Sequence, residues 1–345
     1  MKTKPMTKFA ILALSLVLVA CAGGGSEEAG CPAIDGREIN VVATTPMIGE
    51  FVSQVGGENI NLTVLMPPEA NPHTYEPAPQ DAGTIAEADL VFYTGLLYEP
   101  AALVKLLENS ACSTDILSEV GESVFPIEFK EGGHDDHDDH DDHDDEEGHD
   151  DEEGHDDEEG HDDHEGHNHG AYDPHFWFDP SRVAYAAEYI ESRLIQFDPE
   201  NESSYISSAD SFVSELNDLT KQVSELISTV PSQNRKLITT HESLGYLEAK
   251  FGLEVLSTII PSLNSANEIS PSDLAGVIDV IEDNNVKVIF IESEAPSVYS
   301  ETIVAETGIK SVTGLYVETL KPGQSYSEFL ISNVTLITEN LQDTD

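Results

Sequence analysis

Short apolar segments alternate with amphipathic ones along most of the chain from residue 38 onward. The apolar segments have the length of buried strands, and the amphipathic ones have the spacing of helices. Such alternation predicts parallel sheets with helices on both faces. In the first half, we expect strands at residues 38–43, 60–65, 90–93 and 113–117, and helices at 47–55, 81–87 and 100–108.

A long helical region separates this half from a second alternating one. Asp179 followed by Pro180 is typical of a helix start, because the carboxylate caps free backbone N–H groups and proline suits the first turn. The pattern breaks at Asp198-Pro199 and then continues to residue 230. About thirty helical residues span roughly 45 Å, enough to join two lobes. The apolar stripe of this stretch is Phe212, Leu216, Leu219, Val223, Leu226 and Ile227.

The second half repeats the strand and helix alternation of the first. The expected strands are 236–240, 255–259, 286–292 and 309–313, and the expected helices are 244–251, 270–283, 298–306 and 325–341. The predicted fold is therefore α/β, with two parallel-sheet lobes joined by a long helix. We place the N-terminal lobe at 38–179, the linking helices at 180–230 and the C-terminal lobe at 231–345.

The first residues have the layout of an export signal. Three lysines precede an apolar run at residues 9–20, which is too short to span a membrane comfortably. Leu-Val-Ala-Cys at 18–21 resembles a bacterial lipobox, in which the cysteine carries lipid. We therefore expect a signal peptide at 1–20, lipid on Cys21 and a tether at 21–37. The mature protein would be exported and anchored by lipid, not membrane-spanning.

A tract at residues 131–170 interrupts the first lobe. Residues 131–169 hold 22 Asp and Glu, no Lys or Arg, and ten of the 13 histidines. The tract has too few apolar residues to fold unaided, so we expect a disordered insertion. It is either a solvated acidic linker or a collector that binds several metal ions with low affinity, and we favour the collector. The histidines are His134, His137, His140, His143, His149, His155, His161, His164, His167 and His169.

Charge and cysteine content exclude several classes of protein. The formal net charge of −52 argues against nucleic-acid binding and against docking on anionic lipid through a basic patch. Three cysteines are too few for a disulfide-stapled small fold or a Cys-based zinc module. After export, Cys31 and Cys112 are either paired in a disulfide or two unpaired buried thiols, and their spacing leaves both open.

Three histidines stand outside the tract, each after a predicted strand or in a loop that follows one. They are His73, His175 and His241. Ligands of open α/β sheets bind beyond the carboxyl ends of the strands, so two facing lobes would bring these side chains to one cleft. Three neutral imidazoles and one carboxylate make a good tetrahedral site for Zn²⁺.

The segments around these histidines carry a family resemblance. Residues 71–77, 173–180 and 240–246 resemble the ligand motifs of the cluster A-I solute-binding proteins, the zinc- or manganese-binding lipoproteins of ABC importers. The resemblance covers roughly 38–343 and implies two four-stranded lobes joined by a rigid helix. It also implies a fourth ligand, assigned to Glu318, with Glu292 or a water as alternatives. Glu76 and Glu242, beside the ligands, are expected to orient imidazoles or to be surface carboxylates.

The resemblance also implies a function and partners. A His-rich insertion before the second histidine is typical of the zinc-specific members, and manganese-preferring relatives use more carboxylate oxygen. We therefore expect Zn²⁺ capture and delivery to an ABC permease and its ATPase, by a monomer that binds no nucleic acid. The alternatives are a manganese-binding homologue and a zinc buffer or sensor that acts through the tract. An enzyme is not expected, because His-Glu-x-x-His and Gly-x-Ser-x-Gly are absent and a carboxylate would close the open metal position.

Overall fold

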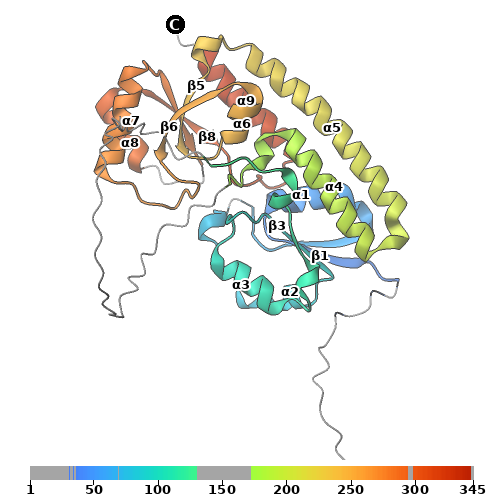
Figure 1. Ribbon diagram of the computed structural model, residues 1–345. Coiled ribbons are helices and arrows are strands. Elements are labelled where there is room, and N and C mark those ends of the chain that lie inside the picture. The colour runs from blue at the N-terminus through green and yellow to red at the C-terminus, as the bar shows by residue number, and fades with distance from the viewer. Residues whose placement is uncertain are drawn as a thin grey trace, which may run out of the picture.

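Two α/β lobes lie along one side of a long helical region in the computed structural model (Figure 1). The structure describes residues 31, 34, 36–68, 70–129, 172–293 and 298–342. The predicted signal peptide, the lipidation site at Cys21, most of the tether and the tract lie outside the described residues. No helix within the described ranges is long and apolar enough to cross a membrane.

The N-terminal lobe is built on one parallel four-stranded sheet. Its strand order is β2-β1-β3-β4, with every pairing parallel. The crossovers between parallel strands carry helices, as the alternating pattern predicts. The strands are β1 Ile39–Ala43, β2 Ile60–Val64, β3 Leu90–Tyr93 and β4 Leu117–Glu119, and the helices are α1 Pro46–Gly56, α2 Pro79–Ala86 and α3 Ala101–Ser110.

The last strand of this sheet begins later than the sequence predicts. Residues 114–116 form a 3₁₀ turn (η3, Thr114–Ile116), and β4 starts only at Leu117. The hydroxyl of Ser113 accepts a hydrogen bond from the backbone N–H of Asp115 at 3.2 Å. Such local side-chain bonds compete with strand pairing, so the expected strand at 113–117 is wrong in its position.

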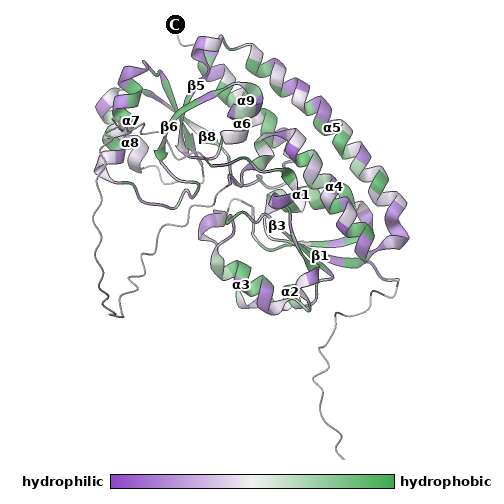
Figure 2. Ribbon diagram, viewed as in Figure 1, coloured by the Kyte–Doolittle hydropathy of each residue, from purple (hydrophilic) through white to green (hydrophobic). Residues whose placement is uncertain are grey.

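The linking region consists of α4 Pro180–Phe197 and α5 Glu202–Ser228, with a 3₁₀ turn (η6, Pro199–Asn201) between them. Asp179 caps α4 as predicted, because its carboxylate accepts from the N–H of Ser181 at 2.9 Å. Polar and apolar residues alternate along α5 (Figure 2), and every residue of its predicted stripe except the half-buried Leu226 is buried. The predicted break at Asp198 is where the chain turns, and Asp198 accepts a hydrogen bond from Tyr205 at 2.6 Å.

The C-terminal lobe differs in one respect from the expected four-stranded sheet. Its strands form two parallel hydrogen-bonded pairs, β5–β6 and β7–β8. Side chains join β5 to β7 where they meet: Thr240 accepts from the N–H of Glu292 at 3.0 Å, and Glu292 accepts from the N–H of His241 at 3.1 Å. The strands are β5 Lys236–His241, β6 Glu254–Ile260, β7 Val288–Glu292 and β8 Lys310–Leu315, and the helices are α6 Gly245–Phe251, α7 Pro271–Asp283, α8 Val298–Thr307 and α9 Tyr326–Gln342.

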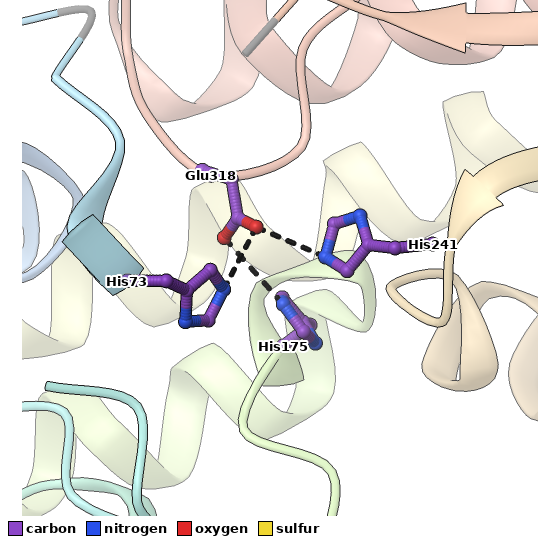
Figure 3. Close-up of side chains that lie close together, drawn as sticks. All are labelled: His73, His175, His241 and Glu318. Carbon is purple, nitrogen blue, oxygen red and sulfur yellow. Dashed lines mark hydrogen bonds and ion pairs between the residues drawn. The ribbon is translucent and has the colours of Figure 1, made fainter. Parts of the chain in front are cut away.

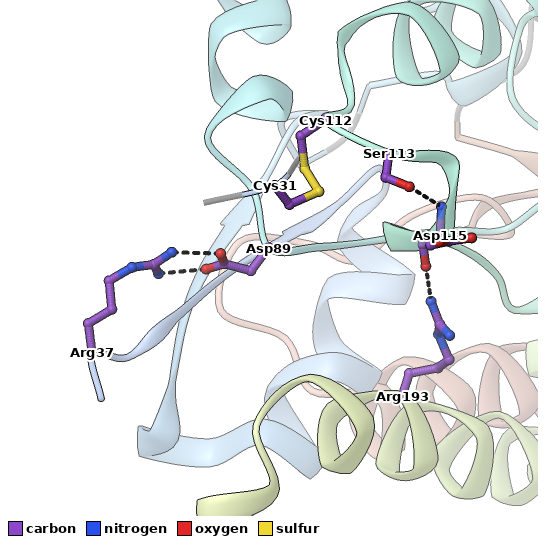
Figure 4. Close-up of a disulfide and its surroundings, with 7 residues drawn as sticks. All are labelled: Cys31, Arg37, Asp89, Cys112, Ser113, Asp115 and Arg193. Atoms are coloured by element: carbon purple, nitrogen blue, oxygen red, sulfur yellow. Dashed lines mark hydrogen bonds and ion pairs between the residues drawn. A yellow bond between two sulfur atoms is a disulfide. The ribbon is translucent and has the colours of Figure 1, made fainter. Parts of the chain in front are cut away.

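A disulfide and an ion pair fasten the start of the described chain to the N-terminal lobe (Figure 4). Cys31 and Cys112 are bonded across 81 residues, with a Cα–Cα distance of 5.1 Å. Nη1 and Nη2 of Arg37 each lie 2.6 Å from an oxygen of the Asp89 carboxylate, which also accepts from the N–H of Asn40. The first strand therefore enters the sheet from a fixed point.

Candidate metal centre

Four side chains from both lobes converge on one point between them (Figure 3). They are His73, His175, His241 and Glu318, and one ligand atom of each lies within 4.8 Å of the others. The four side chains are at most 3% exposed. Three imidazoles and one carboxylate in this arrangement are sufficient to surround a single metal ion.

The first histidine comes from the loop that follows β2. His73 is the middle residue of a 3₁₀ turn (η2, Pro72–Thr74), and the amide oxygen of Asn71 caps this turn by accepting from the N–H of His73 at 2.9 Å. The amide of Asn71 also donates to Ser265 of the other lobe at 3.0 Å. The loop is therefore held both by its own cap and by a contact from the other lobe.

His175 and His241 are each oriented by a carboxylate on the ring nitrogen that faces away from the centre. Nδ1 of His175 lies 2.8 Å from Asp173, and Nδ1 of His241 bonds to Glu292. A carboxylate only accepts hydrogen bonds, so Nδ1 carries the proton and Nε2 keeps a lone pair in the neutral ring. This is the arrangement that aims a histidine at a metal ion.

Glu318 lies in the loop after β8 and reaches all three imidazoles. Its Oε1 lies 3.0 Å from Nε2 of His73 and 2.9 Å from Nε2 of His241, and its Oε2 lies 3.5 Å from Nε2 of His175. The indole N–H of Trp177 donates to the carbonyl of Val317 at 2.8 Å. This bond ties the Glu318 loop to the segment that follows His175.

The charges of the four side chains stabilise one another. Burial alone would lower the pKa of His175, but the carboxylates of Glu318 and Asp173 outweigh burial and raise that pKa to about 9. Burial likewise opposes protonation of His241, whose pKa is nevertheless raised well above its usual value by Glu292 and Glu318. Burial would raise the pKa of Glu318, yet the three histidines hold it well below its usual range. A carboxylate that is fully ionised at neutral pH is a ready ligand for a cation.

In the neutral rings, the lone pairs of two buried nitrogens have no hydrogen-bond donor among the described residues. These nitrogens are Nε2 of His175 and Nε2 of His241, which face the centre of the cluster. Only in the protonated rings do these nitrogens form ion pairs with Glu318. A buried polar atom without a partner is costly, and in native proteins it often marks a ligand position. A cation bound between the four side chains would satisfy both nitrogens.

Comparisons with known proteins identify the family of this chain. Residues 41–340 match the model of the family described as zinc-uptake complex component A, periplasmic. The chain belongs to this family. It is therefore a metal-binding solute-binding protein of an ABC importer that acts outside the cytoplasm, and not an enzyme. As a family member, it works with a permease and an ATPase.

Relatives of this family member carry the names of different metals. The chain is 27% identical over 343 residues to the high-affinity zinc uptake system protein ZnuA of Bacillus subtilis, and the aligned region covers 96% of each protein. It is 26% identical over 348 residues to the manganese ABC transporter substrate-binding lipoprotein PsaA of Streptococcus anginosus. The aligned region covers 98% of this chain and 99% of PsaA. The periplasmic zinc-binding protein TroA of Treponema pallidum has the same fold, with a TM-score of 0.72 at 20% identity over 88% of this chain and 99% of TroA.

The residues that orient the histidines of this family member differ in part from those expected. Glu76 is exposed, and the carboxylate of Glu242 accepts a hydrogen bond from the hydroxyl of Thr258 at 3.4 Å. Burial, followed by the charge of Asp173, raises the pKa of Glu242 to about 7. Asp173 and Glu292 take the expected roles instead. Asp173 stands two residues before His175, a spacing that the sequence displays. Glu292, for which the sequence suggests a competing ligand or a carboxylate that caps a helix or pairs with a cation, instead contacts Nδ1 of His241.

Proposed function

We propose that this protein captures Zn²⁺ outside the membrane and delivers it to the permease of an ABC importer. His73, His175, His241 and Glu318 bind the ion, and Cys21 carries the lipid that keeps the protein at the membrane. The observation that carries the proposal is the buried cluster of three imidazoles and one carboxylate.

The donor set favours zinc over manganese. Zn²⁺ readily takes four ligands with imidazole nitrogen among them, whereas Mn²⁺ is better suited by carboxylate, carbonyl and water oxygens. Three nitrogens and one carboxylate match the first preference. Manganese capture is the alternative, because relatives named for manganese match the chain over most of its length.

In this proposal the tract is a second metal-binding element, with lower affinity than the buried cluster. Its ten histidines offer many interchangeable pairs, and the surrounding carboxylates attract cations but also favour protonated histidine. Binding there would be weak, multiple and sensitive to pH. The tract would thus raise the local zinc concentration near the cleft, whereas in the alternative of a zinc buffer it would be the main binding element.

Deletion of the tract separates capture from buffering. The tract leaves and re-enters the fold at adjacent positions, because Glu128 and Tyr172 form an antiparallel bridge and Asp173 donates to Ile127 at 3.0 Å. A short Gly-Ser linker should therefore replace residues 132–170 without disturbing the cleft. We expect calorimetry on residues 26–345 to show one tight zinc site with and without the tract, and the additional weak sites only with it.

Two outcomes of this titration would contradict the proposal. Loss of all zinc binding on deletion would make the tract the main binding element and the protein a buffer. Manganese binding as tight as zinc binding would oppose zinc capture all the more strongly, because N/O sites in general bind Zn²⁺ more tightly than Mn²⁺. The same titration with manganese provides this second comparison.

Zinc binding should release protons and tighten as the pH rises. The pKa of His175 is about 9 and that of His241 is well above its usual value, so both rings hold protons at pH 7 that a metal ion must displace. We expect about one to two protons released per zinc at pH 7, and an affinity that increases from pH 6 to pH 9. Titration in buffers of different ionisation enthalpy counts these protons, and an observed enthalpy that does not depend on the buffer would contradict the expectation.

A further inference from the structure

The two carboxylate oxygens of Glu318 have different surroundings. Oε1 lies close to His73 and His241, whereas Oε2 lies 2.9 Å from the hydroxyl of Tyr98 and farther, at 3.5 Å, from Nε2 of His175. The same hydroxyl lies 3.1 Å from the backbone carbonyl of Glu318. A carboxylate is a stronger acceptor than a carbonyl, so the phenol proton belongs mainly to Oε2. Tyr98 is 1% exposed, so water does not compete for this bond.

The loop that carries Tyr98 is held in an unusual conformation. Gly95, Leu96 and Leu97 all have positive φ angles, of 78°, 53° and 62°. Left-handed leucines are costly and persist only where the surroundings fix them. Here two carboxylates do so: the buried Glu99 accepts from the N–H groups of residues 94 and 95, and the half-buried Glu119 accepts from the N–H of Leu96. The hydroxyl of Tyr98 is thus presented to Glu318 by a fixed backbone.

We propose that Tyr98 is a positioning residue that restricts Glu318 to binding the metal through one oxygen. The proposal rests on the function proposed above. With Oε2 engaged by the phenol, the protein offers one oxygen and three nitrogens, the four ligands of a tetrahedral zinc site. If Oε2 were released, Glu318 would be able to bind through both oxygens, and the added oxygen would suit a harder ion such as Mn²⁺. Tyr98 would thereby sharpen the choice of zinc.

The ring of Tyr98 has a packing role that must be separated from that of its hydroxyl. Its centroid lies 5.0 Å from that of His73 and 5.3 Å from that of Trp177, both in edge-to-face contact. The substitution Tyr98→Phe keeps these ring contacts and removes only the hydroxyl. Tyr205→Phe is the matched control, because Tyr205 is equally buried but donates to Asp198 in the linking region.

The test combines a selectivity ratio with a spectrum that reports coordination number. Zinc and manganese affinities are measured by competition with a chromophoric chelator, and Co²⁺ serves as the visible probe because four-coordinate Co²⁺ absorbs far more strongly than five- or six-coordinate Co²⁺. We expect the wild-type protein and Tyr205→Phe to give the intense spectrum. In Tyr98→Phe the spectrum should weaken, and the preference for zinc over manganese should fall about ten-fold, the lower end of the effect of losing a partner that orients a ligand.

Several results would overturn the inference. An unchanged cobalt spectrum or an unchanged metal preference in Tyr98→Phe does so, as does the same change in Tyr205→Phe or a wild-type spectrum that is not four-coordinate. Failure of the proposed function looks different: the wild-type protein would then bind manganese as tightly as zinc, whatever the effect of Tyr98→Phe. The variant's unfolding midpoint without metal, compared with that of the control, verifies that both are folded.

Discussion

Replacing His73 or His241 by alanine is expected to abolish tight zinc binding. Each substitution leaves two imidazoles and one carboxylate, and the ion must then complete its coordination with water. Loss of a partner that merely orients a ligand weakens metal binding about 10- to 100-fold, so loss of a ligand should weaken it by at least about 100-fold. Calorimetry on the protein without residues 132–170 measures this effect with no contribution from the tract. Retention of the tight site in either variant would contradict the proposed ligand set.

The two substitutions should differ in what they do to the metal-free protein. His241 is fully buried, and its Nδ1 pairs with Glu292 behind the cluster. His241→Ala leaves this carboxylate buried without its charge partner, which typically costs about 3–5 kcal/mol of folding free energy. His73 pairs with Glu318, which keeps His175 and His241 as partners after the substitution. His73→Ala should therefore cost clearly less.

This difference separates binding from folding. Chemical unfolding in the presence of a chelator gives the stability of each variant, and unfolding with excess zinc gives the gain on binding. When the free zinc concentration is a thousand times the dissociation constant, binding stabilises the native state by about 4 kcal/mol. We expect this gain in the wild-type protein and in the surface control Lys221→Ala, and its loss in both histidine variants. A large loss of metal-free stability in His73→Ala would show that its binding defect reflects misfolding.

Most elements of the fold are predictable because they are set by local patterns. The strand and helix alternation identifies both lobes, and the cap at Asp179 identifies the start of α4 within one residue. The start of β4 is not predictable in this way. Residues 113–117 have the composition of a strand, but the Ser113 hydroxyl offers the backbone a turn in its place. The separate ladders β5–β6 and β7–β8 are not predictable either, because the bond that joins them links Thr240 and Glu292, which lie far apart in the sequence.

The sequence reveals the histidines of the metal centre, but not the groups that orient its side chains. The histidines are recognisable because they follow strands of parallel sheets, whose carboxyl ends share one edge. Their orienting groups are less visible. The bond between Tyr98 and Glu318 joins residues 220 positions apart, and no local pattern marks it. It forms because a strained loop of one lobe meets a loop of the other, a contact that only the folded chain creates.

Removing the disulfide should strongly destabilise the protein without affecting zinc affinity. The bond between Cys31 and Cys112 closes a loop of 81 residues, and a loop of this size restricts the unfolded chain by about 4 kcal/mol in the chain-entropy model. Cys31 precedes β1 and Cys112 precedes β4, so the bond lies at the amino ends of the parallel strands. His73 follows the carboxyl end of β2, so it lies beyond the end of the sheet opposite to the disulfide.

The double substitution Cys31→Ala and Cys112→Ala tests this separation. We expect its unfolding midpoint in denaturant to fall by an amount that corresponds to about 4 kcal/mol, and its zinc affinity at 25 °C to match that of the wild-type protein. Reduction of the wild-type protein by a thiol should lower its stability similarly, whereas the double variant should not respond to the reductant. A weaker zinc site in the folded double variant would mean that the two edges of the sheet are mechanically coupled. The disulfide would then serve metal capture as well as the fixing of the N-terminal segment.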